Sequence, residues 1–81
     1  MSILYTTKAA ALIADAEQIE RDAEQSLRAW IILGQADKYS AAMATARVLR
    51  SAAASRSIWV RREILRNAGF EIRSPRSLVK A

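Results

Sequence analysis

The C-terminal part of the chain concentrates arginines whose chemistry suits anion binding. Six basic residues lie between residues 61 and 80: Arg61, Arg62, Arg66, Arg73, Arg76 and Lys80. Arginine presents a planar fork of donors that forms paired hydrogen bonds with carboxylates and phosphates. Only Glu63 and Glu71 supply opposing charge in this part of the sequence. We therefore predict that the six basic residues bind a partner, and that the partner is acidic.

The distribution of charge along the chain supports this prediction. The 81 residues carry a net charge of +5, made up of −3 over residues 1–37 and +8 over residues 38–81. A strongly basic surface attracts acidic protein surfaces, and it also attracts the phosphate backbone of nucleic acids. The chain contains no recognisable helix-turn-helix, zinc finger or base-stacking platform. An acidic protein surface is therefore the preferred partner, and nucleic acid is the alternative.

Other kinds of chemistry are poorly represented in the sequence. The chain has no histidine and no cysteine, so it lacks the most common general base and the most common soft nucleophile. Glu17, Glu20 and Glu24 provide carboxylates, but metal sites in helical bundles normally add histidines. We interpret the three glutamates as a solvated, salt-bridged helix face. The sequence therefore predicts a non-enzymatic protein with no catalytic residue, no metal and no cofactor.

Two glycines mark the ends of the elements that must position the arginines. Gly34 and Gly69 each follow a long alanine-rich stretch, where a glycine in the left-handed conformation commonly ends a helix. The sequence predicts an all-α fold, an antiparallel two-helix hairpin with helices at about 7–33 and 37–68. The short loop favours antiparallel neighbours. We expect a helical hairpin domain over residues 1–70 and a short basic C-terminal tail over residues 71–81.

Small and apolar residues recur at alternating spacings of three and four, which predicts a packing seam along each helix. The first seam comprises Ala9, Leu12, Ala16, Ile19, Ala23, Ser26, Trp30 and Leu33. The second comprises Ala42, Ala46, Leu49, Ala53, Val60 and Ile64, and it is interrupted at Arg56. The many alanines favour a close approach of the two helices. If the chain reverses near Ala36, Asp22 faces Arg50 and Lys8 lies near Glu63.

Bulky apolar residues gather at the two ends of the predicted hairpin. Ile58, Trp59, Leu65 and Phe70 are expected in the core of the open end. Near the turn, Trp30, Ile31, Ile32 and Leu33 are consecutive, so they point in all directions around the helix. Two helices cannot cover such a run. We therefore predict that it is an apolar interface through which the chain forms a homodimer, a four-helix bundle.

Together these patterns predict a small protein–protein interaction module, such as an adaptor, a chaperone-like binder or an inhibitor. It would engage an acidic partner surface through its C-terminal arginines. The alternative is a small nucleic-acid-binding regulator that uses the same arginines on phosphates. No apolar run approaches the ~20 residues of a membrane span. With no secretory signal recognised, we expect a cytoplasmic protein.

Overall fold

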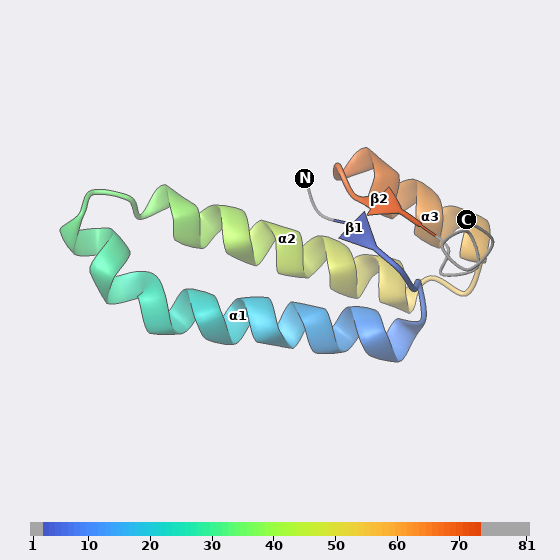
Figure 1. The fold of residues 1–81 in the computed structure, drawn as a ribbon, viewed down its shortest axis with the longest axis horizontal. Coiled ribbons are helices and arrows are strands. Elements are labelled where there is room, and N and C mark those ends of the chain that lie inside the picture. Colours follow the sequence, from blue (N-terminus) through green and yellow to red (C-terminus); the bar gives the residue numbers. More distant parts are fainter. Residues whose placement is uncertain (1–2, 74–81) are drawn as a thin grey trace, which may run out of the picture.

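Three α-helices make up most of the protein in the computed structural model, which describes residues 3–73. They are α1 (Ala9–Ile32), α2 (Asp37–Ala54) and α3 (Ile58–Asn67), and two short strands, β1 (Ile3–Leu4) and β2 (Glu71–Ile72), pair in parallel. Helices α1 and α2 lie side by side, and α3 and both strands gather at the end opposite the α1–α2 loop (Figure 1). The all-α prediction is confirmed. Within residues 3–73, no helix is both long and apolar enough to cross a membrane.

The second predicted helix is not continuous, so the two-helix description is wrong over residues 55–57. Helix α2 ends at Ala54, and Ser55 adopts an extended conformation with ψ of 132°. Ser57 then caps α3, because its hydroxyl oxygen accepts a hydrogen bond from the backbone N–H of Val60 at 3.4 Å. A serine at this position satisfies a donor that the first helical turn leaves unpaired. The interruption of the seam at Arg56 lies within this break.

Both glycines end their helices as the sequence predicts. Gly34 and Gly69 have φ angles of 69° and 94°, in the region that favours glycine. The residue after each glycine donates a backbone hydrogen bond to the carbonyl five residues earlier, at 2.6 and 3.0 Å. In the second case the donor is Phe70 and the acceptor is Leu65. These bonds satisfy helix-end carbonyls in the Schellman arrangement, so the chain can turn sharply at both places.

The buried core follows the predicted seams and consists largely of alanine. Its members are Leu4, Leu12, Ala16, Ala46, Leu49, Ala52, Ala53 and Leu65. Among residues 3–73, only Leu12, Leu49 and Leu65 are large side chains that are fully buried. Because four of the eight core residues are alanines, the backbones of α1 and α2 can approach each other closely. Enlarging one of these alanines would therefore strain the core.

An ion pair between α1 and α2 corrects the predicted register in detail. Arg50 pairs with Glu20, with an Nη2 to Oε1 distance of 2.6 Å, and not with Asp22. Asp22 is exposed and accepts a hydrogen bond from Gln18 at 2.8 Å. Glu20 is half-buried, on the side of α1 nearer α2, and its longer side chain reaches the guanidinium. The hydrogen bond from Arg50 lowers the pKa of Glu20, and the same bond raises the pKa of Arg50.

Candidate functional site

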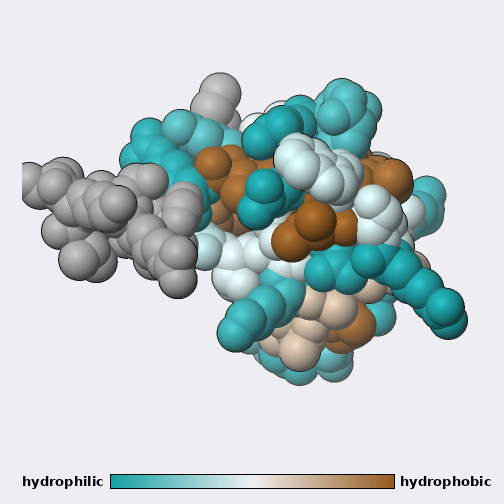
Figure 2. Space-filling model, turned by 90° about the vertical axis from the view of Figure 1, so that its right-hand side faces the viewer, coloured by the Kyte–Doolittle hydropathy of each residue, from teal (hydrophilic) through white to brown (hydrophobic). Residues whose placement is uncertain are grey.

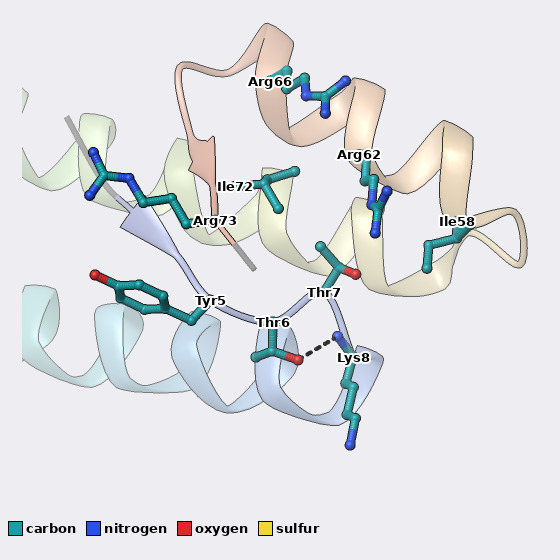
Figure 3. A pocket seen from close by; sticks show the side chains of 9 residues that line it. All are labelled: Tyr5, Thr6, Thr7, Lys8, Ile58, Arg62, Arg66, Ile72 and Arg73. Carbon is teal, nitrogen blue, oxygen red and sulfur yellow. Dashed lines mark hydrogen bonds between the residues drawn. The ribbon is translucent and has the colours of Figure 1, made fainter. Parts of the chain in front are cut away.

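A groove lies where α3 faces the segment that connects β1 to α1. It has a volume of about 410 Å³. Its lining residues are Tyr5, Thr6, Thr7, Lys8, Ile58, Arg62, Arg66, Ile72 and Arg73. Four of these nine side chains are basic and none is acidic, so we call this site the basic groove. Figure 3 shows it from close by.

The basic groove brings together three of the six predicted binding residues. Arg62 and Arg66 lie one turn apart on α3 and extend from the same side of that helix (Figure 3). Arg73 follows β2, and its guanidinium points away from the other two. The predicted residues Arg76 and Lys80 lie outside the residues that the structure describes. The centre of the site is therefore the pair formed by Arg62 and Arg66.

Most of the positive charge in the basic groove has no acidic partner among residues 3–73. The two ion pairs in this part of the chain are Arg50 with Glu20 and Arg73 with Glu71, the latter at 3.0 Å. The hydrogen bond with Glu71 raises the pKa of Arg73. No ion pair within residues 3–73 involves Lys8, Arg62 or Arg66. Lys8 was predicted to lie near Glu63, but the two residues do not form an ion pair.

The hydrogen-bonding capacity of Arg62 is also incompletely used. Its Nε atom is buried and has no hydrogen-bond partner among the described residues. A buried donor without an acceptor is costly, and a donor on a charged group is more costly still. At least one donor of the Arg62 side chain is therefore left unsatisfied by the described residues.

Residues near the N-terminus complete the site, and sequence reasoning missed them as binding residues. Thr6 accepts a hydrogen bond from the backbone N–H of Lys8 at 3.2 Å through its Oγ1 atom, which leaves its hydroxyl proton free to donate. Thr7 points toward Arg62 (Figure 3). Ile58 supplies part of an apolar wall. The sequence did contain one signal for this arrangement. The predicted register placed Lys8 near Glu63, and therefore placed the threonines before Lys8 near the arginines of α3.

The structure gives Arg61 a role different from the predicted one. Its guanidinium is partly buried and donates hydrogen bonds to the carbonyls of Ala52 (3.0 Å), Ser55 (2.6 Å) and Thr7 (2.7 Å). A fourth, longer bond of 3.4 Å reaches Ala53. The last carbonyls of a helix lack partners within it, and basic side chains can satisfy them. Arg61 therefore closes the end of α2 and joins it to the β1–α1 connection, so we do not include it in the basic groove.

The start of α3 exposes apolar side chains that were expected in the core. Trp59 is 77% exposed and Val60 is 50% exposed, although the first was predicted in the open-end core and the second on the seam. The break at residues 55–57 is the cause, because it ends the periodicity of α2 and lets α3 turn a different side toward α2. That side carries Arg61 and the fully buried Leu65.

Trp59 lies on the same side of α3 as the two arginines at the centre of the basic groove. It lies three residues before Arg62 and seven before Arg66, a spacing that places all three on one face of a helix. Ile58, which lines the groove, is 47% exposed. In the view of this end of the molecule, hydrophobic surface lies between hydrophilic side chains (Figure 2). The site therefore combines positive charge with exposed apolar surface.

A second exposed apolar area lies at the C-terminal end of α1. Ile31, Ile32 and Leu33 are 59%, 76% and 66% exposed, whereas Trp30 is partly buried. A shallow groove of about 440 Å³ lies on this part of α1. It is lined by Glu24, Leu27, Arg28, Ile31 and Ile32. We call it the α1-end groove.

No protein-family model matches this chain, and searches of curated proteins and of solved structures find no significant match either.

Proposed function

We propose that this chain is a small, non-enzymatic protein–protein interaction module that engages an acidic partner surface through the basic groove. The observation that carries the proposal is a groove beside exposed apolar side chains that is lined by Lys8, Arg62 and Arg66, which have no acidic partner among residues 3–73. Arginine and tryptophan are enriched among the residues that dominate binding energy at protein interfaces. Binding to a nucleic-acid backbone needs the positive charge and not the apolar surface. The combination of positive charge and apolar surface therefore favours a protein partner. A protein of this kind could be an adaptor, a chaperone-like binder or an inhibitor.

Binding to a short glutamate-rich peptide tests the proposal. The double variant Arg62→Gln/Arg66→Gln should bind this peptide at least about tenfold more weakly than the unchanged protein, because two charge-assisted hydrogen-bonding groups are lost. Fluorescence anisotropy with a labelled peptide measures the affinity. The matched control is Arg21→Gln/Arg47→Gln, which removes two exposed arginines outside the groove. It should keep the affinity within about twofold at physiological ionic strength.

Duplex DNA serves as the competing probe. If DNA binds more tightly than the peptide, and its affinity falls steeply with salt, the chain is a nucleic-acid-binding regulator and the proposal is wrong. Each phosphate contact to duplex DNA contributes a slope of about −0.9 in such a salt series. Equal losses in the groove variant and the control variant would instead show that the basic groove is not the site.

The proposal includes a homodimer in which a second copy covers the α1-end groove and completes a four-helix bundle. The exposed run from Ile31 to Leu33 needs a cover, because apolar patches of this kind are uncommon on monomers. Glu24 and Arg28 line the same groove with opposite charges. A copy related by a two-fold axis presents the same pair in reversed order, so each glutamate can meet an arginine. The surface is therefore complementary to itself.

Light scattering at micromolar concentration tests the dimer. The unchanged protein should have twice the 9.0 kDa mass of the chain, and Ile31→Ser/Ile32→Ser should be a folded monomer because the apolar contact is lost. The control Ile58→Ser changes an equally apolar exposed residue at the other end of the molecule and should remain dimeric. A monodisperse monomer of the unchanged protein would refute the dimer.

A further inference from the structure

We infer that the basic groove holds a phosphate group carried by a side chain of the partner, that is, a phosphorylated serine, threonine or tyrosine. This inference rests on the proposed function, and it narrows the acidic partner to a phosphorylated one. Three features of the groove support it: the amount of unpaired charge, the number of donors and the size of the cavity.

The unpaired charge exceeds what one carboxylate can neutralise. Arg62 and Arg66 line the groove without an acidic partner among residues 3–73, whereas the Lys8 side chain extends away from them (Figure 3) and Arg73 is shared with Glu71. A carboxylate brings one negative charge, whereas a phosphorylated side chain brings about −1.5 to −2 at neutral pH. The phosphate group therefore matches the charge of the basic groove more closely.

The donors of the groove are also numerous enough for a phosphate. Arg62 and Arg66 offer two guanidinium forks from the same side of α3 (Figure 3). Thr7 points toward Arg62 from the β1–α1 connection, whereas the Thr6 hydroxyl is turned toward the backbone N–H of Lys8 (Figure 3). A phosphate group has three strong acceptor oxygens, and clusters of arginine are a recurrent means of binding phosphorylated segments.

The size of the groove is sufficient for a phosphorylated side chain. Its volume of about 410 Å³ lies within the range for small-molecule sites. The exposed Trp59 shares a face of α3 with Arg62 and Arg66 and is available to residues next to the phosphate in the partner. The groove therefore binds the phosphate, while the exposed apolar side chains contact the neighbouring residues of the partner.

Three peptides that differ at one position test the inference: one with phosphoserine, one with glutamate and one with serine. Titration calorimetry should show the phosphoserine peptide binding at least about tenfold more tightly than the glutamate peptide, and the serine peptide binding more weakly than both. Arg62→Lys/Arg66→Lys keeps the charge but removes both forks, so it should reduce the preference for phosphoserine to the part that charge alone supplies. The control Arg21→Lys/Arg47→Lys should keep that preference, and circular dichroism should show that both variants are folded.

The pH dependence supplies a second readout. The phosphate loses its second charge as pH falls through about 6, so the phosphoserine peptide should bind several times more weakly at about pH 5.5 than at about pH 7.5. The chain has no histidine, the side chain that ordinarily titrates in this range. The charged groups around the groove are Lys8, Arg62, Arg66 and the pair of Arg73 with Glu71. The glutamate peptide should therefore bind with the same affinity at both pH values.

Equal affinity for the phosphoserine and glutamate peptides would overturn this inference and leave the proposed function intact. Failure of every acidic peptide to bind would overturn both. Inorganic phosphate alone, or duplex DNA, binding more tightly than the phosphoserine peptide would also overturn the inference. The first result would identify a site for free phosphate, and the second a site for a nucleic acid.

Discussion

Replacing Arg61 by glutamine is expected to lower the free energy of unfolding by about 2 to 4 kcal/mol, although Arg61 was predicted to be a surface binding residue. Its guanidinium donates to carbonyls at the end of α2 and in the β1–α1 connection, over distances of 2.6 to 3.4 Å. A hydrogen bond to a charged group contributes about 1.5 to 3 kcal/mol, and several that share one group do not add in full. Glutamine is too short to reach all of these carbonyls.

Urea denaturation followed by circular dichroism measures this effect. Arg61→Lys keeps the charge and one donor group. Its free energy of unfolding should therefore lie between those of the unchanged protein and Arg61→Gln. The control Arg47→Gln alters an exposed arginine on α2 and should change the free energy of unfolding by no more than about 0.5 kcal/mol. If Arg61→Gln were as mild as Arg47→Gln, the hydrogen bonds of Arg61 would not hold the break between α2 and α3.

Replacing Ala46 by leucine is expected to destabilise the protein by roughly 1 to 3 kcal/mol, toward the upper end of the range for overpacking. Ala46 is completely buried, and its neighbours in the core include several other alanines. A larger side chain therefore has no space unless α1 and α2 move apart. Small domains have few kcal/mol of net stability, so this loss should lower the melting temperature by many degrees.

The matched control for this variant lies on the same helix. Ala44 is exposed, so Ala44→Leu adds the same atoms without disturbing the core. Thermal melting of the two variants at equal concentration compares them directly. Similar melting temperatures for Ala44→Leu and Ala46→Leu would contradict the close packing of alanines between the helices.

The sequence alone predicted the all-α fold, the glycines that end α1 and α3, and most of the buried seam. These features depend on local chemistry: the spacing of apolar residues, and the left-handed conformation that Gly34 and Gly69 adopt. The sequence also contained a local signal for the break between α2 and α3, since Ser57 is a favourable cap and Arg56 interrupts the seam. The long run of helix-favouring residues on both sides of the break instead led to the prediction of one continuous helix.

For the candidate site, the sequence predicted the arginines, but not the groove that three of them line. Arg62 and Arg66 are conspicuous in composition, and their spacing places them one helical turn apart. The threonines and Lys8 join them only because the β1–α1 connection lies beside α3. Parallel pairing of β1 with β2 brings together residues from the two ends of the chain, which no local pattern specifies.

Only the tertiary structure decided which arginines serve the fold and which remain available to a partner. Arg61 and Arg62 are adjacent and chemically identical, yet Arg61 donates to backbone carbonyls of α2 and Arg62 lines the basic groove. Composition fixes the number of donors in a guanidinium but not the acceptors within its reach. Which acceptors are within reach depends on the orientation of α3 after the break. The same orientation exposes Trp59 and buries Leu65.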